Sequence, residues 1–440
     1  MRQKTNSFRS NDGFEKKKKS FGERSGGYNK GRRGSGGGRR AFIDESRFIS
    51  KAKDRKIVEY SPKNRFYDLP INEALKKSIE AKGYEKPTLI QDKAIIPALE
   101  GNDLIGIANT GTGKTAAFLI PLIDKVLNNK NEKVLIIAPT RELAEQISGE
   151  LSGFSKGMKI FSALAVGGMN IGSQIMNIRK GVSFVIGTPG RINDLITRKV
   201  LKLEQFGTLV LDEADRMLDM GFIGEVRNIF EKMPEKKQVL FFSATFEKEI
   251  QRLADDFLKD PVKIEAKTGD TSENVDQDVV KFSRYEEKMD TLHNLLIEGG
   301  FKKVLIFGET KMGVEEVCTN LKDRGFKVVS IHGDKSQRDR RVALKMFKEE
   351  KAEIMVATDV AARGLDIPEV THVINYDIPH TYEDYVHRIG RTGRASSKGT
   401  ALTFVKESMS LYGDRPERGD RNRYRRGEKK PVRQNKKFRR

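Results

Sequence analysis

The sequence has little of what several classes of protein require. Its 440 residues include one cysteine, Cys318, which excludes a disulfide framework and a cysteine-rich zinc site. No apolar run approaches the roughly 20 residues that span a bilayer, and no apolar stretch follows the basic N-terminus as in a secretory signal. Cys318 falls on a predicted helix beside Val314, Val317 and Leu321, which favours a core position. A single thiol indicates a reducing compartment, so we expect a cytoplasmic protein.

Positive charge is abundant, and it lies at the two ends of the chain. The 83 lysines and arginines outnumber the 62 aspartates and glutamates, which gives a net charge of +21. Residues 1–65 carry a net +13 and residues 407–440 a net +8, so residues 66–406 are neutral overall. A neutral core between cationic ends favours a polyanionic partner, and nucleic acid rather than a membrane.

The segments 1–56 and 407–440 are predicted to be disordered basic tails. Stretches such as KKKK at 16–19 and GRRGSGGGRR at 31–40 cannot bury enough apolar surface to offset chain entropy. The tails are either solubilising linkers or, as their Gly/Arg pairs and sparse aromatic residues favour, nucleic-acid contacts. One short amphipathic patch, Phe42–Ile49, is either a transient helix or a docking element.

Short apolar runs alternate with helical patterns through the neutral core. The runs lie at 103–108, 133–139, 183–189, 208–215 and 238–245, and then at 303–310, 327–333, 353–359, 372–377 and 400–405. Continuous Val/Ile/Leu runs of this length indicate parallel strands buried on both faces. The sequence therefore predicts an α/β protein with two tandem doubly wound domains, 57–268 and 269–406, joined near 266–275.

Polar clusters follow these runs directly. They read TGTGKT, PTREL, TPGR, DEAD, SAT and TDVAARG. Because ligands bind outside the carboxyl ends of parallel strands, the clusters of each domain are expected along one edge of its sheet. Two such edges facing each other would form a cleft between the domains.

The octapeptide ANTGTGKT at Ala108–Thr115 has the pattern of a phosphate-binding loop. It follows a strand and opens a helix, so its glycines and the helix N-terminus can direct backbone N–H groups at phosphate. Lys114 would reach the β- and γ-phosphates, and the Thr115 hydroxyl would ligate Mg²⁺. A glycine-rich turn without a ligand is the plainer alternative, which the Lys-Thr pair makes less favoured.

Two further clusters complete a hydrolytic set. Asp212 and Glu213 end the run TLVL, where one carboxylate can hold magnesium and its neighbour can orient the attacking water. Alone, they could form a solvated acidic turn. The sequence HRIGRTGR at 387–394 is either a basic surface helix or a source of arginine fingers, Arg391 and Arg394, whose planar forks match phosphate oxygens.

Taken in order, these motifs resemble those of the DEAD-box RNA helicases over the whole span Phe66–Val405. The matching segments are GYEKPTLIQ at 83–91, ANTGTGKT, PTRELA at 139–144, Gly167–Gly168, TPGR at 188–191, DEAD at 212–215, SAT at 243–245, LIFGET at 305–310, Gln337 to Arg340, TDVAARGLDI at 358–367 and HRIGRTGR. The resemblance implies two RecA-like domains, the first of which contains a Q motif at 64–92. Within the family, the sequence resembles the bacterial RhlE-like branch.

The resemblance also implies roles for individual residues. For ATP it implies Phe66 stacking on adenine, Gln91 pairing with the adenine edge, Asp366 on the ribose, and Ala108, Asn109, Thr110, Gly111, Thr112, Gly113, Lys114 and Thr115 around the phosphates. For coupling of hydrolysis to RNA it implies Asp215, Ser243, Thr245 and His387. For the RNA backbone it implies Arg141, Gly168, Thr188 and Arg191 in one domain and Arg340, Thr358 and Gly364 in the other.

Two departures from the family pattern stand out. Leu89 replaces a common proline, and Gly308–Glu309 replaces an apolar-then-Asn pair, so we assign no contacts to the second motif. No folded RNA-binding domain is expected after Val405.

The function we predict is an ATP-dependent RNA helicase or RNP remodeller. ATP, Mg²⁺ and single-stranded RNA are the expected ligands, and short duplexes the expected substrates of a monomeric enzyme. Ribosomal particles and RNA-decay proteins are candidate partners. The alternatives are an RNA chaperone or scaffold acting through the tails, and a helicase that acts on DNA. An intact hydrolytic set argues against a scaffold, whereas only the family resemblance argues against DNA.

Overall fold

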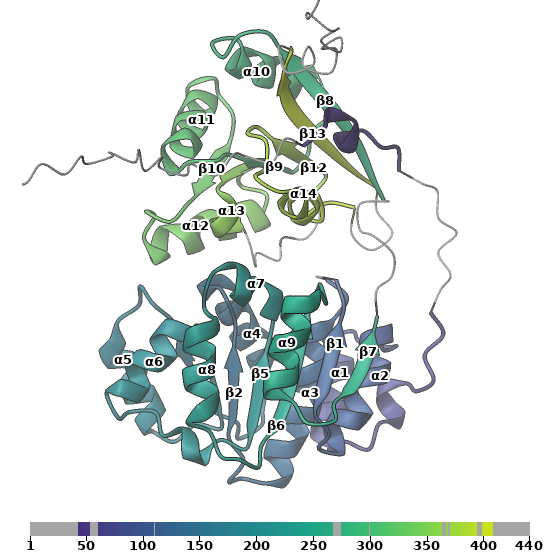
Figure 1. Ribbon diagram of the computed structural model, residues 1–440, viewed down its shortest axis with the longest axis vertical. Coiled ribbons are helices and arrows are strands. Elements are labelled where there is room, and N and C mark those ends of the chain that lie inside the picture. The colour runs from purple at the N-terminus through teal and green to yellow at the C-terminus, as the bar shows by residue number, and fades with distance from the viewer. Residues whose placement is uncertain are drawn as a thin grey trace, which may run out of the picture. The chain divides into compact units, whose positions relative to one another are not determined.

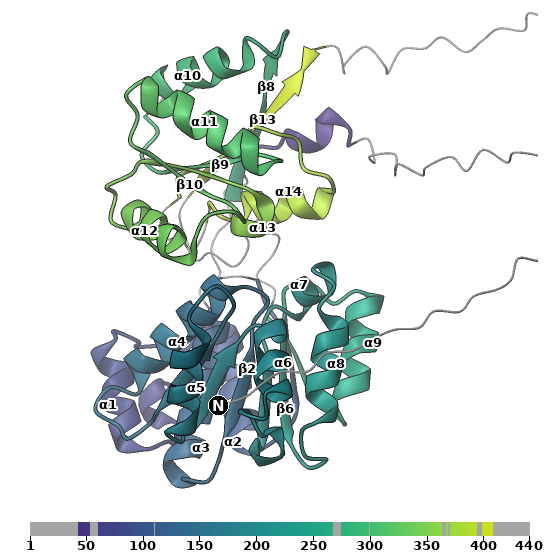
Figure 2. The ribbon, with the colours of Figure 1, turned by 90° about the vertical axis from the view of Figure 1, so that its left-hand side faces the viewer.

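The computed structural model describes residues 43–52, 60–109, 111–266, 274–298, 300–362, 367, 370–393 and 398–407. They form two parallel β-sheets, each with helices on both faces, which confirms the predicted α/β class (Figures 1 and 2). No helix in these ranges is long and apolar enough to cross a membrane. Of the predicted site residues, Thr110, Gly364, Asp366 and Arg394 lie outside the described ranges, as do most residues of both tails.

The first sheet has the strand order β3-β4-β2-β5-β6-β1-β7. Its strands are β1 (Leu104–Ile107), β2 (Val134–Ile137), β3 (Ser162–Ala165), β4 (Phe184–Gly187), β5 (Thr208–Leu211), β6 (Gln238–Ser243) and β7 (Val262–Glu265). Its helices are α1 (Glu73–Ala81), α2 (Leu89–Leu99), α3 (Lys114–Asn128), α4 (Arg141–Phe154), α5 (Ile171–Arg179), α6 (Pro189–Thr197), α7 (Ala214–Asp219), α8 (Ile223–Glu231) and α9 (Lys248–Phe257), with 3₁₀ turns η2 (Phe66–Asp68) and η3 (Leu203–Gln205).

Alternate residues of each strand feed two separate apolar layers. In β2, Ile136 packs with α1 to α4, whereas Leu135 and Ile137 pack with α6 to α9 on the other face. This follows from the period of two in a strand, which points successive side chains to opposite faces. Burial on both faces explains why the central strands are continuously apolar in sequence.

The second sheet has the order β10-β11-β9-β12-β13-β8. Its strands are β8 (Val275–Phe282), β9 (Val304–Phe307), β10 (Val328–Ile331), β11 (Ile354–Ala357), β12 (His372–Asn375) and β13 (Gly399–Lys406), and its helices are α10 (Lys288–Glu298), α11 (Lys311–Asp323), α12 (Gln337–Lys348), α13 (Asp359–Ala362) and α14 (Tyr382–Ile389). Helices α10 and α11 cover one face and α12 to α14 the other. Cys318 on α11 is buried in the first of these layers, as predicted.

The structure adds elements that the sequence patterns did not predict. Strands β3, β7 and β8 all lie at sheet edges. The 3₁₀ turn η1 (Glu45–Phe48) falls in the segment 1–56 predicted to be tail, and it packs against the second sheet, in agreement with the docking alternative given for the patch Phe42–Ile49.

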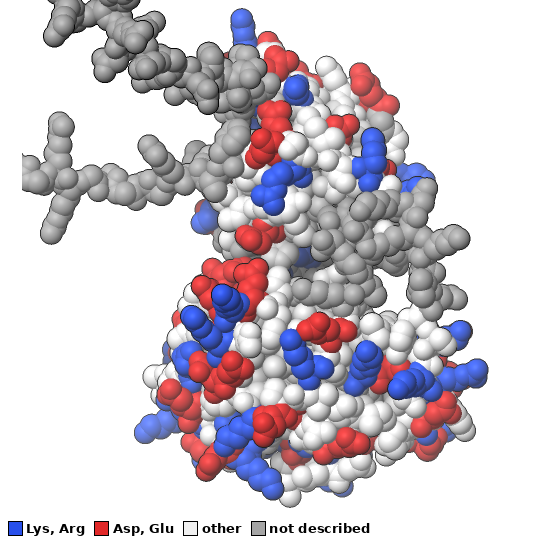
Figure 3. Space-filling model, turned by 45° about the vertical axis from the view of Figure 1, so that its right-hand side comes forward, with Lys and Arg blue, Asp and Glu red and all other residues white. Residues whose placement is uncertain are grey.

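Charges of both signs are interspersed on the described surface. Figure 3 shows lysine and arginine side chains alternating with aspartate and glutamate side chains over the face in view. This mixed surface agrees with the overall neutrality of residues 66–406.

Candidate functional site

Three adjacent strands of the first sheet deliver the hydrolytic motifs to one edge. Strands β5, β6 and β1 are neighbours, and they are followed by Asp212, by Ala244 and by Ala108 respectively. Because the strands are parallel, their carboxyl ends meet at the same edge. A cavity of about 210 Å³ opens there, lined by Tyr84, Gly111, Gly113, Lys114, Thr115, Ala116, Leu143, Gln146, Glu150, Asp212 and Glu213.

The loop between β1 and α3 is shaped by two glycines in the left-handed region. Gly111 has φ +84° and Gly113 has φ +94°, and Gly113 caps the N-terminus of α3. Any side chain at Gly113 would collide with the Gln91 amide. Lys114 is buried, and its Nζ donates to the Ala108 carbonyl at 2.8 Å. The loop can thus present N–H groups and one cation to a phosphate chain.

Gln91 joins the loop to the segment before it. Its Nε2 donates to the Gly113 carbonyl at 3.1 Å, and its Oε1 accepts from the Thr88 N–H at 2.9 Å. Phe66 is only 3% exposed and packs edge-on against Tyr84, with ring centroids 5.9 Å apart. Tyr84 is the aromatic residue that lines the cavity. Sequence reasoning did not single out Tyr84.

Glu213 is held charged in a strained conformation. Its φ is +54°, a value that costs energy for a residue with a side chain and is typical of functional sites. Burial alone would raise the pKa of Glu213, but Arg216 and Lys114 outweigh it and hold that pKa below its ordinary value. The Arg216 Nη1 to Glu213 Oε2 distance is 2.6 Å. An anion therefore stays available at the cavity wall.

The pKa of Asp212 is shifted in the direction opposite to that of Glu213. Burial raises the pKa of Asp212 to about 7, and Lys114 only partly offsets that effect. A positive ion beside this carboxylate would restore its charged form. Asp212 and Thr115 both line the cavity and offer the hard oxygen donors that Mg²⁺ prefers.

The described residues contain no group of three or more His, Cys, Asp or Glu arranged to hold a metal by themselves. Mg²⁺ commonly binds through one or two protein oxygens and completes its shell with water and substrate phosphates. Thr115 and Asp212 fit that mode.

Asp215 connects the acidic motif to the SAT segment after β6. Its Oδ2 accepts from the N–H groups of Ala244 and Thr245, both at 3.0 Å, and from the Thr245 hydroxyl at 3.3 Å. The neighbouring Ser243 Oγ is fully buried with no hydrogen-bond partner among the described residues. Buried polar groups in native structures are rarely left unpaired, and a functional role is one of the accepted explanations for an exception.

A second set of polar residues follows the other half of the same edge. Arg141 comes after β2, Gly168 after β3 and Thr188 after β4, and these three strands are adjacent in the sheet. The Arg141 guanidinium lies over Gly167 and Gly168, so a side chain on Gly168, whose φ is +75°, would collide with it. The Arg191 Nη1 donates to the Met169 carbonyl at 3.4 Å. Cations and small residues thus gather there.

The second sheet carries its predicted residues at the ends of its own strands. Arg340 lies on α12 after β10, Thr358 follows β11, and His387 lies on α14 after β12. Arg391 stands two residues beyond the end of α14 and is 5% exposed. The structure therefore places these residues on one edge of the second sheet.

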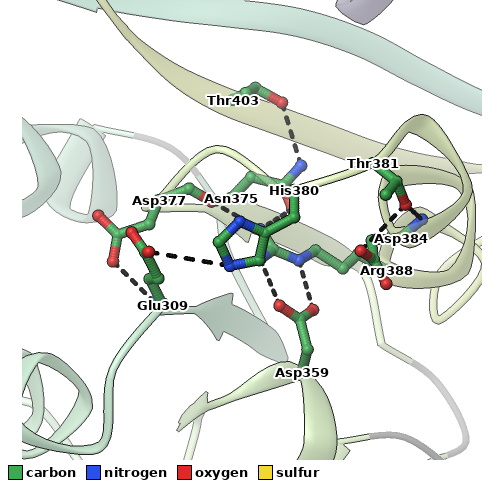
Figure 4. A network of polar contacts seen from close by, with 9 residues as sticks. All are labelled: Glu309, Asp359, Asn375, Asp377, His380, Thr381, Asp384, Arg388 and Thr403. Atoms are coloured by element: carbon green, nitrogen blue, oxygen red, sulfur yellow. Dashed lines mark hydrogen bonds and ion pairs between the residues drawn. The ribbon is translucent and has the colours of Figure 1, made fainter. Parts of the chain in front are cut away.

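A buried arginine that sequence reasoning passed over fixes α14. Arg388 is 2% exposed. Its Nε donates to Asp359 Oδ1 and its Nη2 donates to Asp359 Oδ2, both at 2.6 Å. Its Nη1 donates to the Asp377 carbonyl at 2.6 Å and to the Asn375 side chain at 3.3 Å. Figure 4 shows this fork, together with the hydrogen bond that the Asn375 amide donates to the Thr403 hydroxyl. Arg388 therefore holds the helix that precedes Arg391.

The sequence matches two family descriptions. Residues 88–253 match the DEAD/DEAH box helicase domain and residues 287–396 the helicase conserved C-terminal domain. The chain is 47% identical over 350 residues to the ATP-dependent RNA helicase CshA of Listeria monocytogenes, covering 79% of this chain and 67% of that protein. The chain belongs to the DEAD-box RNA helicase family. As a member, it is an ATP-dependent RNA helicase and an RNA-dependent ATPase.

Solved structures of DEAD-box helicases agree with the fold. Dbp5 of S. cerevisiae bound to RNA and ADP BeF3 matches with a TM-score of 0.70 and 32% identity, over 78% of this chain and 89% of that one. Mss116p bound to single-stranded RNA and AMP-PNP matches with a TM-score of 0.71 and 30% identity, over 79% and 76%. The two sheets of this DEAD-box protein are therefore RecA-like, as predicted.

Proposed function

We propose that this helicase binds single-stranded RNA through its backbone and unpairs short duplexes locally, without reading sequence. The observation that carries the proposal is the division of one sheet edge. The hydrolytic set follows β5, β6 and β1, and the cationic set follows β3, β4 and β2. A strand of RNA bound at the second set would lie beside the nucleotide bound at the first. Backbone contacts position a strand but carry no sequence information.

The proposed division of labour at the nucleotide follows from the geometry. Lys114 and the loop N–H groups bind the phosphates, while Glu213, held charged beside Arg216, orients the attacking water. Thr115 and Asp212 would hold Mg²⁺, which neutralises charge on the phosphates when bound. Arg391 and Arg394 would stabilise the charge that develops in the transition state. Gln91, with Phe66 or Tyr84, would select adenine, and Asp366 would contact the ribose.

The proposed coupling runs through Asp215. This carboxylate binds the backbone of Ala244 and Thr245, so a shift of the SAT segment on RNA binding would move the chain next to Glu213. Ser243 would gain a partner in that rearrangement, and His387 would contribute from the second domain.

Duplex unwinding tests the proposal directly. Short RNA duplexes of about 10 base pairs should separate rapidly with ATP, and duplexes several times longer should not, because local unpairing needs few steps. Equal rates on short and long duplexes would contradict local unpairing and indicate translocation. If neither short nor long duplexes separate although the ATPase is fully active, the result would favour the scaffold alternative.

Replacing Gly168 should weaken RNA binding through Arg141. In Gly168→Ala the new methyl group displaces the Arg141 guanidinium, and the φ of +75° adds about 1–2 kcal/mol of backbone strain. We expect lower RNA affinity and a salt slope reduced by about 0.7, the value for one lost phosphate contact. Gly149→Ala is the matched control, since a methyl group on that α4 residue meets nothing within 4 Å. Equal RNA affinity in the two variants would show that Arg141 does not contact RNA.

Gln91→Ala should raise the ATP concentration needed for half-maximal turnover and weaken discrimination against GTP. The change removes the amide that would read the adenine edge and its link to Gly113. Turnover by the wild-type and variant proteins with ATP and with GTP measures the effect. If the wild type already uses GTP as well as ATP, Gln91 does not read the base.

Removing the basic ends should lower RNA affinity at low salt and leave maximal turnover unchanged. The truncation removes residues 1–42 and 412–440 and keeps η1, because η1 packs on the second sheet. Each lost phosphate contact should flatten the slope of log affinity against log salt by about 0.7. A salt titration of both proteins measures this. An unchanged slope would leave the ends as solubilising linkers.

The remaining parts of the proposal concern organisation. We place the domain limits at 57–268 and 269–406, between the two basic tails 1–56 and 407–440. Residues 43–52 lie within the first of these tails in sequence, but we assign them to the second domain because they pack on it. We propose a cytoplasmic location, on the grounds of the single buried thiol. We also propose a monomer that acts on ribosomal particles or alongside RNA-decay proteins.

A further inference from the structure

Residues 43–52 precede the first domain in the chain but pack on the second. Phe48 is 1% exposed and lies in the apolar layer that contains Val275 and Tyr385. The ring centroids of Phe48 and Tyr385 are 4.8 Å apart. Figures 1 and 2 both draw this purple segment beside β8 and β13. The segment is thus part of the core of the second domain.

Polar contacts hold the same segment at three further points. The Ser50 N–H and carbonyl exchange hydrogen bonds of 3.0 and 2.7 Å with Gln277 at the edge of β8. The Ala52 N–H donates to Asp276 Oδ1 at 3.0 Å. The Arg47 guanidinium lies 3.8 Å from the centre of the Tyr382 ring on α14. Backbone pairing, apolar burial and a cation–π contact together define one register of docking.

The chain is anchored again where the first domain begins. Asp92 accepts four hydrogen bonds from the lead-in segment: from the Tyr60 hydroxyl at 2.6 Å, the Lys63 N–H at 2.8 Å, and the Asn64 N–H and Nδ2 at 3.2 and 3.1 Å. Burial alone would raise the pKa of Asp92, but these hydrogen bonds outweigh it and hold that pKa below its ordinary value. The anchor is therefore a charged acceptor, which makes its hydrogen bonds strong.

We propose that residues 43–65 form a second covalent connection between the two domains, in addition to the one through 267–273. Its anchors are Phe48 on the second domain and Asp92 on the first. Eight residue steps separate Ala52 from Tyr60, so a fully extended chain spans at most about 28 Å between them. The connection limits how far the domains separate and raises the effective concentration of one at the other.

Both anchors adjoin elements of the catalytic cycle. Phe48 and Arg47 contact α14, the helix that precedes Arg391, and Asp92 directly follows Gln91. The connection therefore acts as a positioning device for closure of the enzyme. This positioning role rests on the function proposed above, whereas the limit on domain separation follows from the two anchors alone.

Phe48→Ala tests the anchor on the second domain, with Ile49→Ala as its matched control because Ile49 is 51% exposed. We expect the RNA concentration for half-maximal ATPase to rise about threefold or more in Phe48→Ala, as for a lengthened closing loop. Maximal turnover should change less than twofold, and Ile49→Ala should match the wild type. Equal behaviour of the two variants would overturn the proposal.

An insertion distinguishes the proposed connection between the domains from a segment that only stabilises the second domain. Twelve Gly/Ser residues placed after Lys56 leave both anchors intact and lengthen only the chain between them. We expect the same rise in RNA requirement as in Phe48→Ala, with unchanged thermal unfolding. If the insertion behaves as wild type while Phe48→Ala does not, the segment only stabilises the second domain and the proposal fails.

Single-molecule energy transfer measures the domain separation itself. The native Cys318 is buried, so dyes can be directed to Asn177→Cys and Thr319→Cys, one exposed position on each domain. Without ligands, Phe48→Ala and the insertion should both populate longer separations than Ile49→Ala or the wild type. Identical distributions in all four proteins would contradict a second connection.

Discussion

Glu213→Gln is expected to lose ATP turnover by at least about 100-fold while keeping ATP and RNA binding. The substitution preserves shape and leaves an oxygen near Arg216, whose Nη1 lies 2.6 Å from the carboxylate. Magnesium ligation by Thr115 and Asp212 would remain, so ATP would bind but the water would lack its orienting anion. RNA affinity in the presence of ATP should rise, because bound complexes no longer turn over.

Glu231→Gln supplies the control, since it makes the same chemical change at an exposed residue that ends α8. Steady-state ATPase and equilibrium RNA binding with ATP report on the two variants. Near-normal turnover in Glu213→Gln would remove this residue from the chemistry. Loss of ATP binding would mean that Glu213 contributes to binding ATP rather than to orienting the attacking water.

Arg391→Ala should lower RNA-stimulated turnover by about 10³-fold, the lower end of what arginine fingers contribute in phosphoryl transfer. Arg391→Lys should recover little of this, because an ammonium group lacks the planar fork that matches phosphate oxygens. ATP affinity should change much less than turnover, since the charge that Arg391 offsets develops only in the transition state.

Arg324→Ala controls for loss of an arginine from the same domain, where Arg324 forms a surface ion pair of 2.6 Å with Asp290. Because Arg391 is 5% exposed, thermal unfolding of each variant should accompany the kinetics. A folded Arg391→Ala protein with wild-type turnover would contradict the finger role, and equal losses in ATP affinity and turnover would indicate a binding role only.

The central strands were predictable from sequence because burial on both faces makes them continuously apolar. The edge strands were not. In β7 only Ile264 is buried among four residues, and in β8 only Val275, Gln277 and Phe282 are buried among eight. For η1 the sequence offered docking as one of two alternatives but not the docking surface, because its partner Tyr385 lies more than 300 residues away and only the fold brings them together.

Some residues of the candidate site were likewise predictable from the sequence and others were not. Lys114, Asp212 and Thr245 could be named because each belongs to a motif that begins where a recognisable strand ends, and parallel strands bring such motifs to one edge. Arg388 could not be distinguished from Arg391 within HRIGRTGR, since only the folded chain shows that one is bound to Asp359. The importance of Asp92 was likewise invisible, because its four hydrogen bonds join residues about 30 positions apart.

The most direct test of the account is the ATPase rate of the full chain without nucleic acid, with single-stranded RNA, and with DNA of matched sequence and length. We predict a low rate alone, strong stimulation by RNA and little by DNA, because the 2′-hydroxyl distinguishes the two strands. Sequence changes in the RNA should leave the stimulated rate unaltered. Equal rates in all three conditions, or equal stimulation by DNA, would contradict an RNA-dependent ATPase.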